Sequence, residues 1–196
     1  MSEVISEFRE KFTETEKSFG DITHPVWFGG NGPPVILMHE LDGFIPAFMQ
    51  LAIRLSESFT IYTPVFYGKV GERFSGLTAY FCMRREFEVF RLGKTSPIVG
   101  WIRDLAADIH RSSGAKGVGV VGMCMTGGIV LATISHPSVA AGVAAQPSLP
   151  LTTGLPLPLL SSRRRKEDIG MDPHDIQAAA DSGTPVLTLR YGNDPI

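Results

Sequence analysis

The stretch VGVVGMCMTGG, residues 118–128, decides the fold of this chain. Its Val and Gly residues are typical of a buried strand, and the glycines at its end are typical of a sharp turn into a helix. A cysteine, Cys124, stands in that turn. Two interpretations are open: a small hydrophobic residue in a tight turn, or a nucleophile presented at the end of a sheet.

The composition is typical of one globular domain. The 196 residues are 43% hydrophobic and 19% charged, which is enough for one well-buried core and short for two. A formal net charge of -2 gives no reason to expect nucleic acid or a membrane surface as a partner. The longest apolar stretch, 118–134, contains glycines and threonines, which favours a strand–turn–helix over a membrane span.

Cysteine usage indicates a reducing compartment. The chain has two cysteines, Cys82 and Cys124, which cannot form a disulfide framework. Residues 1–12 carry charges throughout and lack the apolar core of a signal peptide. We therefore expect a cytoplasmic protein.

Predicted strands and helices alternate along the chain. Apolar runs predict strands at 33–40, 59–68, 116–124, 139–148 and 184–192. Apolar residues spaced three and four apart predict helices at 48–55, 96–109 and 127–135. This alternation favours a single α/β domain over 1–196, with a mainly parallel sheet covered by helices on both faces.

Residues 147–175 break the alternation, because they are rich in proline, leucine and charge. Two interpretations are equally open, a lid or excursion over the functional site and an irregular surface loop.

Three of the segments that contain predicted strands end in polar or reactive residues. They are His39 with Glu40, Cys124, and Asp194. The carboxyl ends of parallel strands are where function gathers in such sheets. A cysteine between a strand and a helix also lies at the helix N-terminus, whose dipole favours the reactive thiolate. The backbone N–H of Met125 is then placed to stabilise an oxyanion.

The loop after the first predicted strand adds further candidates. We expect the N–H of Leu41 to be a second oxyanion donor and Glu40 to hold or accept the proton of Cys124. The alternative for Glu40 is that it caps the next helix. His39 either contributes to the chemistry, including contact with substrate, or donates to a backbone carbonyl and orders the adjacent turn.

Five segments resemble the dienelactone hydrolase family of the α/β-hydrolase superfamily. They are VILMHELDGF (35–44), FCMRREF (81–87), GKTSPIVGWIRDLA (93–106), GVGVVGMCMTGG (117–128) and TPVLTLRYGNDP (184–195). The resemblance covers nearly all of the chain. It implies a three-layer α/β-hydrolase-like fold and hydrolysis of a small-molecule ester or lactone through a thioester.

The resemblance also implies roles for individual residues. Cys124 matches the nucleophile, Glu40 the carboxylate that activates the thiol, and Asp194 the acid of a Cys–Asp–His triad. Arg84 or Arg85 lies where the family places a substrate-binding arginine. No set of residues has metal-ligand spacing such as HExxH, and we expect no metal and no cofactor.

Two departures from the family pattern stand out. Thr126 follows two places after Cys124, where a β-branched side chain is expected to crowd the turn. In addition, no histidine follows Asp194, although the fold orders its triad as nucleophile, acid and histidine. The five histidines are His24, His39, His110, His136 and His174.

Three explanations for the missing histidine are open. The chain is a fragment that lacks its last strand and helix, or His174 or His39 substitutes, or catalysis has been lost. Two rival functions are also open. A glutamine-amidotransferase-like thiol hydrolase would need a downstream His-x-Glu pair, which HPS at 136–138 does not supply. A non-catalytic protein that binds ligand or senses thiol oxidation would keep Cys124 without turnover. The sequence indicates neither a particular substrate nor an oligomeric state.

Overall fold

The computed structural model of the 196-residue chain describes residues 2–73, 95–147, 171–190 and 192. Three predicted site residues, Arg84, Arg85 and Asp194, lie outside the described residues. Most of the predicted lid does so too, since only residue 147 and residues 171–175 of that segment are described.

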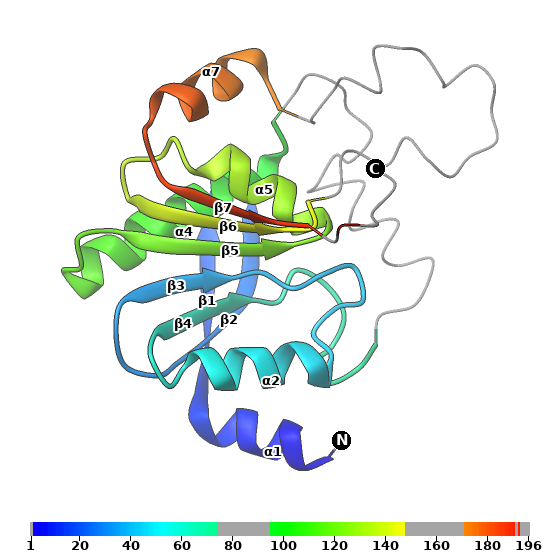
Figure 1. Cartoon of the computed structure of the whole chain (residues 1–196). Coiled ribbons are helices and arrows are strands. Elements are labelled where there is room, and N and C mark those ends of the chain that lie inside the picture. The colour runs from blue at the N-terminus through cyan, green and yellow to red at the C-terminus, as the bar shows by residue number, and fades with distance from the viewer. Residues whose placement is uncertain (1, 74–94, 148–170, 191, 193–196) are drawn as a thin grey trace, which may run out of the picture.

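A twisted sheet forms the centre of the molecule (Figure 1). The described part of the sheet has seven strands in the order β1-β2-β4-β3-β5-β6-β7. The first two pairings, β1 with β2 and β2 with β4, are antiparallel, and all others are parallel. The strands are β1 (Phe12–Phe19), β2 (Ile22–Gly29), β3 (Pro34–Leu37), β4 (Thr60–Pro64), β5 (Val118–Met123), β6 (Val139–Ala145) and β7 (Val186–Leu189).

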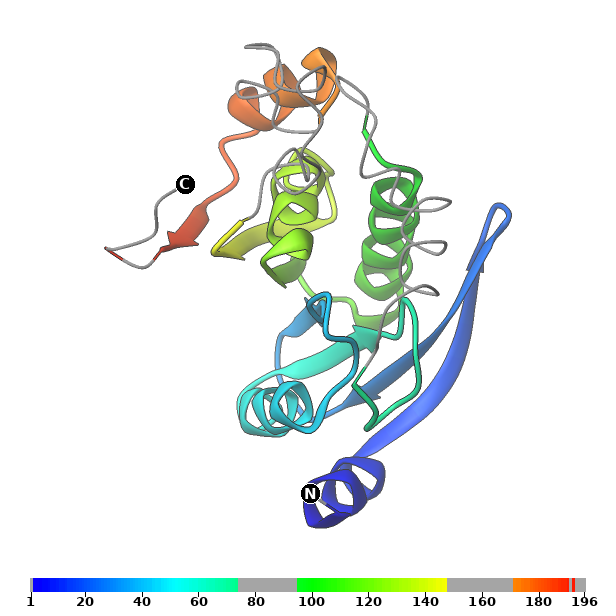
Figure 2. The same ribbon diagram turned by 90° about the vertical axis from the view of Figure 1, so that its right-hand side faces the viewer.

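Helices cover both faces of the sheet, which makes the fold a three-layer α/β fold (Figure 2). The described helices are α1 (Ser2–Lys11), α2 (Pro46–Leu55), α4 (Pro97–Ser113), α5 (Met125–Thr133) and α7 (Pro173–Asp181). One buried cluster joins α4 and α5 to the sheet, and a second joins α1 and α2 to its other face. The strand β5 serves both, because Val118 and Val120 face the first cluster while Val121 and Met123 face the second.

Local sequence accounts for the best-predicted helix. Pro97 is the first residue of α4, with Ser96 at the N-cap position and Gly114 in the left-handed conformation after the last turn. Its buried face includes Ile98, Ile102, Leu105 and Ile109. Within the described residues, no helix is both long and apolar enough to cross a membrane.

The five predicted strands are all present, and each is shorter than the sequence indicates. The predicted strands 33–40 and 59–68 end early, at Leu37 and Pro64. The predicted helix 127–135 begins two residues earlier, at Met125. The hairpin β1–β2, and with it the antiparallel part of the sheet, was not predicted.

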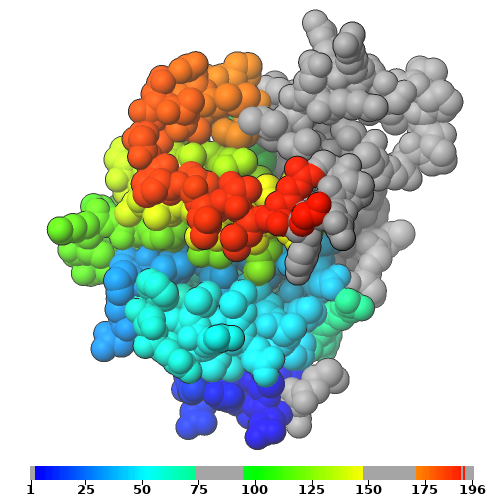
Figure 3. Space-filling model, viewed as in Figure 1, coloured from blue at the N-terminus to red at the C-terminus, as the bar shows by residue number. Residues whose placement is uncertain are grey.

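Two further features of the sheet bear on the site. The helix α5 crosses β6 where Gly142 has no side chain, and a Cβ there would lie 2.8 Å from Val130 and 3.0 Å from Ile134. The strand β7 lies at the edge of the described sheet and at the molecular surface (Figure 3). Its side chains Leu187 and Leu189 are 56% and 48% exposed.

Candidate active site

Cys124 stands at the turn between β5 and α5 in a strained backbone conformation. Its φ is 53° and its ψ is -117°. A residue with a side chain rarely adopts a positive φ, and such strain persists only where surrounding contacts enforce it. Two hydrogen bonds do so: the N–H of Cys124 donates to the carbonyl of Ala145 at 2.9 Å, and its carbonyl accepts from Gly127 at 3.0 Å. The thiol is free and partly exposed, as a nucleophile requires.

Close backbone approach explains the glycines around the cysteine. A Cβ on Gly122 would lie 2.3 Å from the carbonyl oxygen of Thr126, and one on Gly127 would lie 2.9 Å from the Cα of Pro147. No side chain fits at such distances without moving backbone. The sharp turn that these glycines predict is therefore present, and it requires glycine at both positions.

Thr126 does not crowd the turn, contrary to the expectation from its β-branched side chain. The side chain is fully buried beneath the turn. Its hydroxyl oxygen accepts from the N–H of Met123 at 2.9 Å and lies 2.9 Å from the carbonyl of the same residue. The threonine thus ties the end of β5 to the first turn of α5, and it supports the conformation of Cys124.

The loop after β3 lies beside this turn. The strands β3 and β5 are neighbours, and the N–H of Met38 continues their pairing by donating to Val121 at 2.9 Å. The arrowheads of both strands point to the same edge of the sheet (Figure 1). Glu40 and Leu41, which follow β3, therefore lie at the edge of the sheet on which Cys124 stands. Capping by Glu40 is excluded, because the N-cap of α2 is Ile45.

The Glu40 carbonyl accepts three hydrogen bonds. The donors are Nδ1 of His39 at 2.8 Å, the hydroxyl of Tyr67 at 2.8 Å and the N–H of Gly43 at 3.0 Å. Burial raises the pKa of the Tyr67 hydroxyl strongly, and the negative charges of Cys124, Asp42 and Glu40 raise it further. Tyr67 is therefore a neutral donor throughout the neutral pH range, and it lies within the electrostatic reach of the cysteine.

His39 is fully buried among aromatic rings. Its Nδ1 donates to the Glu40 carbonyl, and its Nε2 accepts from the N–H of Phe66 at 3.1 Å. Burial lowers its pKa from 6.5 to about 4, so the ring is neutral at pH 7. Both nitrogens are engaged by backbone groups, which favours the turn-ordering interpretation of this histidine over contact with substrate. The surrounding rings are those of Phe44, Phe48, Phe66 and Tyr67.

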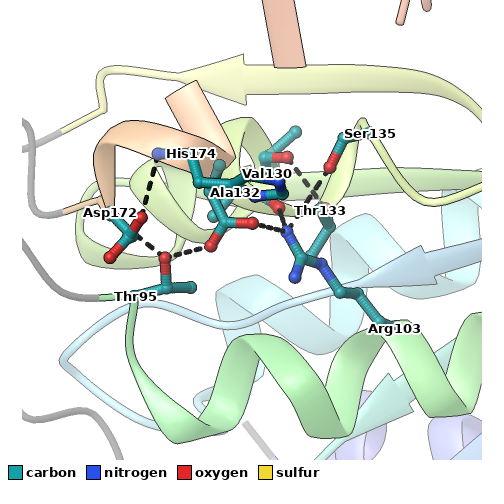
Figure 4. Close-up of polar contacts among 9 residues, drawn as sticks. Thr95, Arg103, Val130, Ala132, Thr133, Ser135, Asp172 and His174 are labelled. Atoms are coloured by element: carbon teal, nitrogen blue, oxygen red, sulfur yellow. Dashed lines mark hydrogen bonds and ion pairs between the residues drawn. The ribbon is translucent and has the colours of Figure 1, made fainter. Parts of the chain in front are cut away.

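His136 and His174 belong to parts of the fold other than the turn at Cys124. His136 follows the C-terminal end of α5, whereas Cys124 precedes its N-terminal end. His174 lies in the first turn of α7, where its N–H donates to the Asp172 side chain at 2.9 Å (Figure 4). Among the described residues, no group of three or more His, Cys, Asp or Glu side chains is arranged to hold a metal ion.

Tyr67 is the residue at this site that sequence reasoning missed. In the structure Tyr67 follows β4, at the same edge of the sheet as Glu40 and Cys124. The predicted strand 59–68 includes this tyrosine, which hides it among strand residues, whereas β4 ends at Pro64 and leaves Tyr67 in the loop.

Solved structures show the class of protein to which this fold belongs. A protein from Klebsiella pneumoniae subsp. pneumoniae MGH 78578, assigned as a dienelactone hydrolase, superposes with a TM-score of 0.53 at 15% identity. The match covers 91% of this chain and 85% of that one. A protein from Acinetobacter baumannii AYE, assigned as a lipase, superposes with a TM-score of 0.50 at 16% identity. That match covers 74% of this chain and 45% of the lipase, so the chain spans less than half of its length. The fold is that of α/β hydrolases.

The family is given by the sequence. The model of the dienelactone hydrolase family matches residues 21–196, and the chain belongs to that family. No curated protein sequence matches the chain significantly.

Proposed function

We propose that this protein hydrolyses a small-molecule ester or lactone with Cys124 as the nucleophile. The observation that carries the proposal is the strained backbone of a partly exposed cysteine at the N-terminus of α5. A fold maintains such strain where the side chain must be presented to a ligand. Membership of the dienelactone hydrolase family supports hydrolysis as the reaction class.

The acylation step uses three parts of the site. The thiolate of Cys124 attacks the carbonyl carbon, and the carbonyl oxygen becomes an oxyanion that accepts from the N–H groups of Met125 and Leu41. The carbon–oxygen bond to the alcohol then breaks, and the proton that the thiol lost goes to the alkoxide. The products are an enzyme thioester and the alcohol, which stays attached to the acyl group when the substrate is a lactone.

Glu40 is the proposed acceptor for the thiol proton, because its side chain belongs to the loop beside the turn. Family resemblance supports two further roles. Asp194 is the proposed acid of the triad, and Arg84 or Arg85 is the proposed contact for an acidic group of the substrate. Hydrolysis of the thioester by water returns the thiol and releases the acid. We assign none of the described histidines as the base that activates this water. The described residues therefore support the acylation half of the cycle.

The experiment is an acylation assay on the full 196-residue chain with p-nitrophenyl acetate. Intact-mass spectrometry is expected to show one added acetyl group, and release of nitrophenol is expected to show a burst of one equivalent. Cys124→Ala removes both signals. Cys82→Ala is the matched control, because it removes the other thiol of the chain and leaves both signals.

Two results would contradict the proposal. One is a wild-type chain that gains no acetyl group; the other is an adduct that persists in Cys124→Ala. A Cys124 that is oxidised readily by peroxide but never acylated would instead support a thiol-sensing protein. A nucleophilic thiol needs a reducing environment, and we therefore also propose that the protein works in the cytoplasm.

A further inference from the structure

The Glu40 carbonyl and the Leu41 N–H belong to one planar peptide group. Because the peptide is rigid, fixing the carbonyl oxygen also fixes the direction of the N–H on its opposite side. The oxygen accepts from His39, Tyr67 and Gly43, at 2.8, 2.8 and 3.0 Å. Two of these donors are side chains, and one of them, Tyr67, lies 27 residues further along the sequence, so it is not part of the turn itself.

We propose that Tyr67 and His39 are positioning residues for the reaction, which hold the Glu40 carbonyl and thereby aim the Leu41 N–H at the oxyanion. This inference rests on the proposed function. It assigns the two side chains no contact with substrate, since both act through the peptide between Glu40 and Leu41.

The donors are themselves held firmly. Tyr67 is 5% exposed and His39 fully buried, and their rings meet edge to face with centroids 4.8 Å apart. The N–H of Phe66 donates to Nε2 of His39, which leaves Nδ1 of the neutral ring to carry the proton that it donates to Glu40. The residue after Phe66 is Tyr67 itself, so one segment after β4 fixes both donors.

Two physical effects follow from this arrangement. Orientation of a donor before the reaction removes the cost of reorganising it as charge develops on the substrate. Hydrogen bonds accepted by the carbonyl also polarise the peptide, which makes its N–H a stronger donor. Removal of an oxyanion donor costs about 100-fold or more in rate, and loss of one support behind such a donor is expected to cost about 10-fold.

The test compares Tyr67→Phe with Tyr62→Phe on the full chain. Tyr62 lies on β4 and stacks on Phe28, with ring centroids 5.8 Å apart, so its hydroxyl is a control for loss of a tyrosine hydroxyl outside the site. In Tyr67→Phe we expect acylation by saturating p-nitrophenyl acetate to slow by about 10-fold, with the half-saturating ester concentration unchanged. Alkylation of Cys124 by iodoacetamide, which develops no oxyanion, is expected to keep its rate. Tyr62→Phe is expected to leave all three quantities unchanged.

A second measurement does not depend on turnover. The ¹⁵N resonance of a backbone amide responds to hydrogen bonds accepted by the carbonyl of its own peptide group. The Leu41 ¹⁵N resonance is therefore expected to shift in Tyr67→Phe and to stay in place in Tyr62→Phe. His39→Asn, which retains a donor near Nδ1, is expected to preserve more of the acylation rate than His39→Leu, provided that both variants fold.

The outcomes separate this inference from the proposed function. If the wild-type chain is not acylated, the proposed function fails, and the Leu41 resonance still decides whether Tyr67 positions the peptide. If the wild type is acylated and Tyr67→Phe is acylated equally fast, the positioning role is overturned. Parallel losses of acylation and alkylation would also overturn it, because they would place the effect of Tyr67 on the thiol.

Discussion

The two ends of α5 are built differently. At its N-terminal end Cys124 makes no side-chain capping bond, and its backbone is strained. At its C-terminal end Arg103 donates to the carbonyl of Ala132 at 2.5 Å and to the hydroxyl of Ser135 at 3.4 Å (Figure 4). A helix carries partial positive charge at its start and partial negative charge at its end. A cation of the protein therefore partly neutralises the end of α5, whereas the N-cap side chain makes no hydrogen bond to its start.

The C-terminal end of α5, called the closed end because Arg103 binds its carbonyl, is also joined to α7. The N-terminal end, at Cys124, is called the open end. Arg103 forms an ion pair with Asp175 at 2.9 Å, and the hydroxyl of Thr95 donates to the same carboxylate. The N–H of Asp172 in turn donates to Thr95 at 3.1 Å. Burial alone would raise the pKa of Asp175, but the hydrogen bonds from Thr95 and Arg103 outweigh it and lower that pKa below 3.8. The comparison shows that polar side chains at the C-terminal end of α5 join this helix to α4 and α7, whereas the N-cap residue Cys124 makes no side-chain capping bond.

The largest effect is expected from Gly122→Ala at the open end. The new Cβ would lie 2.3 Å from the Thr126 carbonyl oxygen, so the turn must move, and a shift of about 1 Å at reacting groups costs about 100-fold in rate. The burst rate with p-nitrophenyl acetate measures this loss. Gly100→Ala on α4 is the control, because a Cβ there meets nothing within 4 Å; an equal loss in both variants would refute the steric explanation.

The groups beside the two ends of α5 are also expected to lower the stability of the fold in different pH ranges. The unfolded chain protonates His39 near pH 6.5, whereas the folded chain does so only near pH 4. Between these values the unfolded state binds more protons, so the free energy of unfolding falls as the pH falls, by up to about 3 kcal/mol. Asp175 has a lowered pKa, so its contribution is present above 3.8 and is lost at still lower pH. Urea titrations from pH 7 to pH 4 measure the first effect.

The matched variant for this pH effect is His39→Gln. It lacks the titrating ring, so its stability is expected to depend less on pH between 6.5 and 4 than that of the wild type. An unchanged slope of stability against pH in the variant would show that other groups cause the loss.

A smaller effect is expected from Arg103→Ala at the closed end. The variant removes the ion pair with Asp175 and leaves the Ala132 carbonyl without this donor, which should cost about 2 kcal/mol in the free energy of unfolding. Both side chains are largely buried, at 23% and 16% exposed. Urea unfolding measures the cost, and the double variant with Asp175→Asn tests the coupling. Additive effects of the two substitutions would show that the pair contributes nothing of its own.

The smallest effect is expected from Thr126→Val. It removes the hydroxyl that accepts from the N–H of Met123 and leaves that group buried without this partner, at a cost of about 1 kcal/mol. Thr126→Ser keeps the hydroxyl and should retain most of the stability. Thermal unfolding compares the two. Equal stability of Thr126→Val and the wild type would mean that the buried hydroxyl does not support the turn.

The part of the fold that was predictable from sequence is the part with local signals. The strand, glycines and cysteine of 118–128 indicate a strand–turn–helix because backbone sterics act over a few residues. The strand β1 reads FTETEKSF and has few apolar residues, so the sequence alone does not indicate a strand that pairing with β2 forms. The helix α7 has no buried residue, so it lacks the apolar stripe that predicts a helix.

The candidate site shows the same division. Cys124, Glu40 and Leu41 could be proposed because each stands at or directly after the end of a predicted strand. The role of Arg103 could not, because its partner Asp175 is 72 residues away in sequence and the contact depends on how α4 and α7 pack. The support from Thr126 was also unpredictable, since its side chain could be expected either to crowd the turn or to bond beneath it until the backbone was known.

Gly142 gives a way to tune this protein from outside its candidate active site. The absence of a side chain at Gly142 lets α5 pack closely on β6. A methyl group at this position would press on Val130 and Ile134 and push α5 away from β6. Because α5 begins at the residue after Cys124, such a displacement would be transmitted along a stiff rod to the amide groups at its start. Directed-evolution libraries that vary only the visible rim of the site would overlook this adjustment.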